Sequence, residues 1–230
     1  MTDSKLSESD ARRTIRSIDP NLESQFACVV SILNRYPSLR PTLRGRTKAD
    51  TSNSEYLSGL AKQFSASREP RAPQAPQTIP DSVVGTILAG YYDIPSNTLN
   101  QIAHTHSLSM AAENLVGDLL ERYIADALEP IGWTWCSGSV VRSVDFIGPV
   151  RPNLPQILLQ VKNRDNSENS SSSAVRDGTD IQKWFRSFSR RPATNWGAFP
   201  DVSARSKLSE TGFNSYVRVR MLQIRPKDKP

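Results

Sequence analysis

One stretch in the second half of the chain constrains the fold more than any other. Residues 109–128 carry apolar side chains at helical spacing, and Pro130 and Gly132 then stop the helix. Two short apolar runs follow at residues 143–147 and 157–164, where β-branched and aromatic side chains favour strands. The order helix, strand, loop, strand predicts two adjacent antiparallel strands backed by the long helix. The fold class is therefore expected to be α/β.

The first hundred residues are expected to be mostly helical. Apolar spacing predicts three helices, over residues 10–18, 22–36 and 54–64. Prolines interrupt residues 68–80 and predict a linker, after which Asp81 and Ser82 form an N-cap pair for another helix. We therefore divide the chain into a mostly helical N-terminal region, residues 1–105, and a second region, residues 106–230, that holds the α/β core.

Three segments after the long helix complete the predicted secondary structure. Residues 133–147 are expected to be rich in β-structure. Residues 179–190 have apolar side chains at helical spacing and predict an amphipathic helix, with Trp184 and Phe188 toward the core. Residues 216–225 alternate in polarity and predict a half-buried strand with a basic outer face.

Side chains suited to metal chemistry lie on the two predicted strands. Asp145 places a carboxylate among apolar neighbours, a setting that usually requires a metal, a hydrogen-bond partner or an edge position. Gln160 and Lys162 are two residues apart and share one strand face, while Val161 turns into the core and still offers its backbone carbonyl. Magnesium prefers such hard oxygen ligands. The spacing therefore predicts a magnesium site built from Asp145, Gln160 and the Val161 carbonyl, with Lys162 beside it.

The long helix is expected to add a further acid to this site. Glu121 is polar within an apolar stripe and is the first candidate, with Glu113 and Asp118 as alternatives. An ordinary exposed helix charge explains Glu121 equally well. Bound magnesium would activate a water for attack on a phosphodiester, and Lys162 would lower the pKa of that water or stabilise the transition state.

Charge is distributed unevenly along the sequence. The net charge is +6, but residues 139–230 hold 16 basic and 8 acidic side chains, a net charge of +8, whereas residues 1–138 sum to −2. Positive charge beside a candidate metal site indicates a polyanionic partner, and a solvated basic face is the alternative explanation. Two cysteines and two histidines offer no usual zinc site, and His104 and His106 are poor candidates for a catalytic base.

Basic and amide side chains suited to DNA contacts follow the second predicted strand. The candidates are Arg164, Arg176, Lys183, Arg186, Arg190, Arg191, Asn195, Arg205 and Lys207. Lys183, Arg186 and Arg190 share one face of the helix predicted over residues 179–190. Repeated basic residues on a helix fix the register of a protein on DNA without reading bases, so these three are expected to contact phosphates.

Three blocks of the sequence, residues 112–125, 132–147 and 158–164, resemble a known family. They are similar to the SinI-type type II restriction endonucleases of the PD-(D/E)xK nuclease superfamily. The resemblance implies a restriction-endonuclease-like core, which is a mixed sheet flanked by helices. It also implies magnesium-dependent, site-specific cleavage of double-stranded DNA at GGWCC by a homodimer. A cognate DNA methyltransferase is expected to protect the same site.

The resemblance assigns roles to individual residues. Asp145 matches the aspartate of the motif, Lys162 its lysine, and Glu121 the supporting helix acid. Val144 stands where the motif has proline, a residue that only shapes the backbone. Gln160 stands where the motif has an acid, which removes one negative charge from the metal site. Either Glu121 compensates for that charge, or the site binds metal more weakly until a DNA phosphate joins it.

Two other functions remain open at this stage. One is a non-catalytic duplex DNA-binding protein, and the other is a structural or RNA-associated protein in which Asp145 and Lys162 form a salt bridge. No stretch of the sequence reaches the apolar length of a membrane span, and the first residues lack the layout of a secretory signal. We therefore expect a cytoplasmic protein without a membrane partner.

Overall fold

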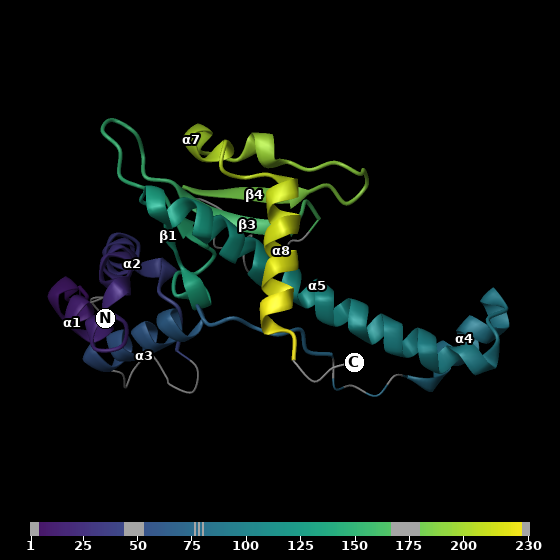
Figure 1. The fold of residues 1–230 in the computed structure, drawn as a ribbon. Coiled ribbons are helices and arrows are strands. Elements are labelled where there is room, and N and C mark those ends of the chain that lie inside the picture. The colour runs from purple at the N-terminus through teal and green to yellow at the C-terminus, as the bar shows by residue number, and fades with distance from the viewer. Residues whose placement is uncertain are drawn as a thin grey trace.

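A four-stranded mixed sheet lies at the centre of the described structure (Figure 1). The computed structural model describes residues 5–43, 53–75, 77, 79, 81–166 and 180–226. The strands follow one another in the order β1 (Thr134–Trp135), β2 (Phe146–Ile147), β3 (Leu158–Arg164) and β4 (Ile181–Ser187). Strands β1, β2 and β3 pair antiparallel, whereas β3 and β4 pair parallel. The predicted α/β class and the predicted antiparallel pair, β2 and β3, are confirmed.

Helices form much of the rest of the described chain. Their bounds are α1 Glu8–Arg16, α2 Glu23–Arg35, α3 Asn53–Ala66, α4 Ser82–Tyr92, α5 Leu99–Leu128, α7 Val202–Arg205 and α8 Glu210–Ile224. Short 3-10 helices lie at Pro20–Leu22, Pro37–Leu39, Ser96–Thr98, Glu129–Ile131, Ser137–Ser139 and Trp196–Ala198. The helices predicted in the first hundred residues are confirmed, and the Asp81 side chain caps α4 by accepting a hydrogen bond from the Val83 N–H.

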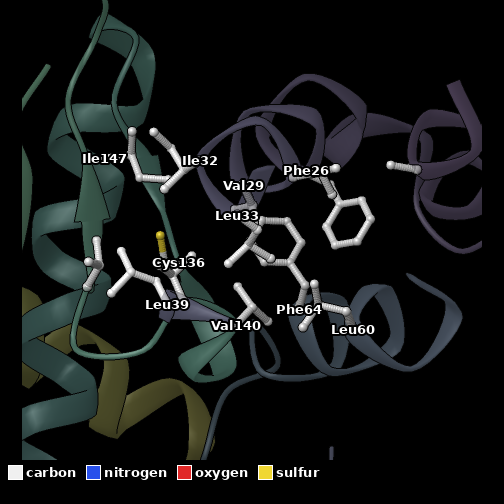
Figure 2. Packing of buried hydrophobic residues seen from close by; sticks show 14 of the residues in the cluster. Phe26, Val29, Ile32, Leu33, Leu39, Leu60, Phe64, Cys136, Val140 and Ile147 are labelled. Carbon is white, nitrogen blue, oxygen red and sulfur yellow. The ribbon is translucent and has the colours of Figure 1, made fainter. Parts of the chain in front are cut away.

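Two apolar clusters cover opposite faces of the sheet. Successive strand residues point to opposite faces, and they divide accordingly between the clusters. Ile147, Leu158 and Ile181 join the N-terminal cluster, which contains the buried side chains of α1, α2 and α3. Figure 2 shows side chains of α2 and α3 packed against Cys136 and other residues of the sheet region.

The second cluster, called the α5 cluster below, contains the apolar stripe of α5. That stripe is buried as predicted, at Leu115, Leu119, Leu120, Tyr123, Ile124 and Leu128. Leu159, Val161 and Trp184 join it from the other face of the sheet. The core position predicted for Trp184 is confirmed, since this side chain is buried within the α5 cluster. The sheet is therefore covered on both faces, with α5 fixed against β3.

The helix predicted over residues 179–190 is wrong, because residues 181–187 form β4. Ile181 and Trp184 fit helical spacing, but in the structure they enter different clusters on opposite faces of the sheet. A strand that is buried on both faces does not show simple alternation. Its parallel pairing with β3 therefore decides the structure of this segment, which local spacing alone could not reveal.

The strand predicted over residues 216–225 is also wrong, because residues 216–224 belong to α8. The Ser209 hydroxyl caps the helix by accepting a hydrogen bond from the Gly212 N–H. Phe213, Val217 and Met221 pack against the α5 cluster at a spacing of four residues. This helical stripe and the cap outweigh the short alternation of valine and arginine.

Other predicted boundaries shift. The long helix α5 begins at Leu99, earlier than predicted, so the expected division between residues 105 and 106 falls inside it. Residues 133–147 contain only the two short strands β1 and β2, with the turn Ser137–Ser139 between them. The described residues of the expected linker, 68–80, form neither helix nor strand. Among the described residues, no helix is long and apolar enough to cross a membrane.

Candidate active site

Asp145 is held where β2 and β3 separate. Its backbone N–H donates to the Leu159 carbonyl at 2.8 Å, and its carbonyl accepts from the Cys136 N–H at 2.8 Å. Its side-chain Oδ2 accepts a hydrogen bond from the Val161 N–H at 2.7 Å. The pairing of β2 with β3 ends at Phe146 and Leu159. Beyond that point the Asp145 carboxylate, rather than a backbone carbonyl, accepts the hydrogen bond from the Val161 N–H of β3.

Glu121, on helix α5, lies close enough to Asp145 for the two carboxyl groups to interact electrostatically. Its Oε2 accepts a hydrogen bond from the Trp135 indole Nε1 at 2.9 Å. Burial, followed by the nearby charge of Asp145, raises the pKa of Glu121 to about 8. Burial likewise raises the pKa of Asp145 to about 6, a rise limited by the Val161 hydrogen bond and by the charge of Lys162. Two half-buried acids, of which Asp145 raises the cost of ionising Glu121, form a site that a cation would stabilise.

The structure distinguishes Glu121 from the other helix acids considered. Glu113 is exposed on α5. The Asp118 carboxylate forms an ion pair with Arg122, with Oδ2 and Nε 2.7 Å apart. The carboxyl group of Glu121 interacts electrostatically with Asp145.

Gln160 is the least satisfied polar residue of the site. It is only 3% exposed, and its Oε1 has no hydrogen-bond partner among the described residues. A buried acceptor without a partner costs about 1–3 kcal/mol, so such a group calls for an explanation. A hard divalent cation would supply the missing partner, because amide oxygens are among its ordinary ligands.

The backbone carbonyl of Val161 has a favourable direction for the same purpose. In an extended strand, the N–H and C=O of one residue point to the same edge. The Val161 N–H points to the Asp145 carboxylate, so its carbonyl also points to that side, past the end of the β2 pairing. No group of three His, Cys, Asp or Glu side chains forms a metal site within the described ranges. A cation here would therefore depend on Gln160 and the backbone as well as on the acids.

Lys162 is half-buried and shares a strand face with Gln160. Its positive charge acts on Asp145, where it favours the ionised carboxylate. Lys162 and Glu121 therefore each interact electrostatically with Asp145, and Gln160 lies next to Val161 on the same strand as Lys162.

A pair of arginines, the buried Arg122 and the half-buried Arg68, supports Glu121 and was missed by the sequence analysis. The guanidinium groups of Arg68 and Arg122 lie over the Trp135 ring, 5.1 and 5.2 Å from its centroid. Arg122 also donates to the carbonyls of residues 67–69, which ties the segment after α3 to α5. The indole that donates to Glu121 is thereby fixed in place. Arg122, a charge inside the buried stripe of α5, was the available signal for this network.

The residues predicted to bind DNA fall into three groups. Exposed side chains are Arg164, Arg190, Arg191 and Lys207. Arg176 lies outside the described residues. The others are half-buried, at Lys183, Arg186, Asn195 and Arg205.

Arg186, Asn195 and Arg205 have internal partners that would compete with DNA contacts. Arg186 bonds to Asn163 and forms an ion pair with Glu210. Asn195 donates its side-chain N–H to the Phe185 carbonyl at 3.1 Å, and Arg205 donates to the Phe199 carbonyl at 2.7 Å. Because β4 is a strand, Lys183, Arg186 and Arg190 do not share the helix face on which their phosphate contacts were predicted.

Comparison with known proteins gives a consistent result over nearly the whole chain. The family model of the SinI restriction endonuclease matches residues 7–223. The type II restriction enzyme SinI of Salmonella infantis is 46% identical over 94% of this chain and 94% of its own length. The type II restriction enzyme Eco47I of Escherichia coli is 45% identical over 96% of both chains.

These matches cover the three blocks that carry the sequence resemblance and the residues of the candidate site. The expected enzyme class, a type II site-specific deoxyribonuclease acting on double-stranded DNA, is confirmed, and the two non-catalytic alternatives are set aside. The mixed sheet flanked by helices agrees with the expected PD-(D/E)xK-like core. The chain belongs to the SinI restriction endonuclease family.

Proposed function

We propose that this restriction endonuclease cleaves duplex DNA at GGWCC, that it uses Mg²⁺, and that it acts as a homodimer. A cognate methyltransferase would protect the same site in host DNA. Both the target and the dimer follow from the family resemblance of the motif blocks. A palindromic target has two equivalent strands, and a two-fold symmetric dimer presents one active site to each of them.

The donor set of the site fits a divalent cation. Asp145, the Val161 carbonyl and Gln160 Oε1 would hold it, and Glu121 would add a second carboxylate. Bound Mg²⁺ supplies a more acidic water and absorbs charge that grows on the phosphate oxygens. The single observation that carries this proposal is the unpartnered, buried oxygen of Gln160 on the strand that also pairs with Asp145.

The remaining site residues would position and stabilise the reacting groups. Lys162 would donate to the phosphate undergoing attack, where its charge offsets the negative charge of the transition state. The Val161 N–H holds the Asp145 carboxylate in one orientation, and the Trp135 indole does the same for Glu121. Neither carboxylate then needs to reorganise during the reaction.

DNA binding is proposed for the basic C-terminal part of the chain. The exposed Arg164, Arg190, Arg191 and Lys207 are the first candidates, because each can reach a phosphate or a base without breaking an ion pair that the structure contains. Arg176, Lys183, Arg186, Asn195 and Arg205 stay in the predicted set. Contacts to guanine edges from arginine would read the G·C pairs of GGWCC.

Digestion of a DNA of known sequence tests the target. The purified protein with Mg²⁺ should produce discrete fragments whose ends all map to GGWCC. A matched DNA in which each such site is changed to GGSCC should stay intact. Cleavage at a different recurring sequence would overturn the proposed target, while fragments that need no added divalent cation would overturn the proposed cofactor.

A further inference from the structure

Residues 81–110, called the arm below, form a helical projection that buries none of its side chains. The arm consists of α4, the turn after it and the first part of α5, and each of its residues is half-buried or exposed. Figure 1 shows the arm extending away from the sheet and from α1, α2 and α3. Short helices are marginal in water unless an apolar face packs against another element. An arm that packs on so little of its own chain therefore indicates a missing covering surface.

The arm presents a continuous apolar face. Val83, Ile87 and Tyr91 are four residues apart on α4 and are 58%, 53% and 77% exposed. Val84 and Tyr92 lie beside them in the next column of the same helix, and the Tyr91 and Tyr92 rings pack edge to face 4.8 Å apart. Side chains spaced in this way form a ridge of the kind that packs into the groove of another helix.

Charge argues against DNA as the occupant of this face. From residue 82 to residue 112 the sequence holds one charged side chain, Asp93, and no lysine or arginine. Binding a polyanion requires cationic side chains that replace its counterions. An uncharged face offers no charge pairing to a foreign partner, but it is compatible with an identical face on a second copy.

The area also matches what a stable dimer needs. The exposed apolar side chains of the arm are Val83, Val84, Ile87, Tyr91, Tyr92, Leu108 and Met110. Those of α4 alone present on the order of 600 Å², most of what each partner of a standard-size complex buries, whereas Leu108 and Met110 lie two residues apart on α5 and point to different faces. The α5 part of the arm adds a shallow, open hollow of about 390 Å³ lined by Gln101, Ile102, Thr105, His106 and Ser109.

We propose that two copies of this chain dimerise through the arm, with α4 and the first part of α5 of each copy packed about a two-fold axis. The inference rests on the proposed function only for the number of copies. It assigns the interface to residues 81–110 and leaves the basic C-terminal part of each copy available for DNA.

Sedimentation equilibrium without DNA or metal tests the interface. The full-length protein should have the mass of two chains at micromolar concentration. The Val84→Asp/Ile87→Asp variant should have the mass of one chain, with its dimerisation constant weakened by roughly 100-fold or more. Val150→Asp is the matched control, since Val150 is 81% exposed but lies outside the arm, and it should stay dimeric. Circular dichroism of all three proteins checks that they are folded.

The possible outcomes separate this inference from the proposed function. A monomeric wild type would overturn both the arm interface and the proposed homodimer, without bearing on target or cofactor. A dimeric wild type whose arm variant also stays dimeric would overturn the arm interface alone. Cysteine cross-linking gives an independent measurement: Tyr91→Cys should form a disulfide-linked dimer under mild oxidation and Val150→Cys should not. Equal cross-linking of the two variants would contradict the proposal.

Discussion

The side chain of Gln160 destabilises the folded protein, and the same side chain is proposed as a metal ligand. Its side-chain oxygen is buried and has no hydrogen-bond partner among the described residues, so the metal-free protein bears an energetic cost for keeping it there. The family motif has an acid at the position of Gln160. With an amide there instead, the site carries one negative charge fewer, and it already contains two acids with raised pKa values. The amide therefore lowers the repulsion within the empty site while keeping an oxygen for the cation.

Replacing Gln160 by leucine should separate stability from activity. Gln160→Leu removes the unsatisfied amide and keeps a similar volume, so the metal-free variant should be as stable as the wild type or more stable by about 1 kcal/mol. Its cleavage rate should nevertheless fall by roughly 100-fold or more, because a ligand is lost. Urea unfolding and plasmid digestion measure the two effects. Gln160→Glu, which keeps an oxygen, is the control and should retain cleavage with an altered metal preference.

The two acids predict a pH dependence of stability in the absence of metal. Burial raises the pKa of Glu121 from 4.5 to about 8 and that of Asp145 from 3.8 to about 6. The folded state then binds more protons than the unfolded state between about pH 4 and pH 8. This contribution to the free energy of unfolding is therefore full at the acidic end and is lost as the pH rises.

Glu121→Gln should remove most of the fall in the free energy of unfolding that accompanies rising pH. At pH 8 the variant should be more stable than the metal-free wild type by on the order of 4 kcal/mol, and the difference should shrink toward pH 5. Urea unfolding in the presence of a chelator measures it at each pH. Glu113→Gln, on the exposed side of the same helix, should follow the wild-type profile. A stability gain of Glu121→Gln that grew toward acid would contradict the predicted sign.

At the scale of elements, α8 depends on an ion pair with β4. Arg186 joins Glu210 and Asn163 and lies over the Phe213 ring, 5.1 Å from its centroid. Glu210 also accepts from the Trp196 indole at 2.9 Å. These contacts fix the start of α8 against the end of the sheet. The predicted phosphate contact of Arg186 would have to compete with them.

Arg186→Ala decides between the two roles of that residue. We expect the free energy of unfolding to fall by about 2 kcal/mol, because Glu210 loses a largely buried partner. If Arg186 also contacts a phosphate, the slope of log binding constant against log salt should fall by about 1. Arg190→Ala is the exposed control, expected to change the salt slope by about 1 and to leave stability unchanged. An unchanged salt slope for Arg186→Ala would remove this residue from the DNA-binding set.

Local signals predicted some elements and not others. Caps and apolar stripes were sufficient for α2, α4 and the buried part of α5, because these helices bury one continuous face or begin at a side-chain cap. They were insufficient for β4, where Ile181 and Trp184 are buried on opposite faces through pairing with a distant strand. For α8, the stripe from Phe213 to Met221 was present in the sequence, but the shorter alternation after Tyr216 was given more weight.

Local sequence signals also predicted only part of the candidate active site. Period-two spacing placed Gln160 and Lys162 on one face, and the short connection between β2 and β3 brought Asp145 beside them. Spacing could not show that Asp145 bonds to the Val161 N–H, since that bond depends on where the β2 pairing ends. It also could not show the Arg68, Trp135 and Arg122 network, which joins three segments far apart in the sequence.

At the scale of the whole molecule, separate parts of the chain carry separate tasks. The helices α1, α2 and α3 cover one face of the sheet, α5 covers the other, and the site lies where α5 meets β2 and β3. The excess positive charge lies beyond residue 138, whereas the arm, which has no lysine or arginine, lies before it. This arrangement allows DNA binding and self-association on different surfaces.

Cleavage of a plasmid with one GGWCC site tests the central claim most directly. With Mg²⁺, the wild type should linearise the plasmid. Asp145→Asn and Lys162→Met should slow cleavage by roughly 1000-fold or more while still shifting the duplex on a gel, because each removes a group that acts on the transition state. Lys62→Met, an exposed lysine of α3, should cleave like the wild type. Wild-type cleavage by Asp145→Asn or by Lys162→Met would contradict the assignment of the active site.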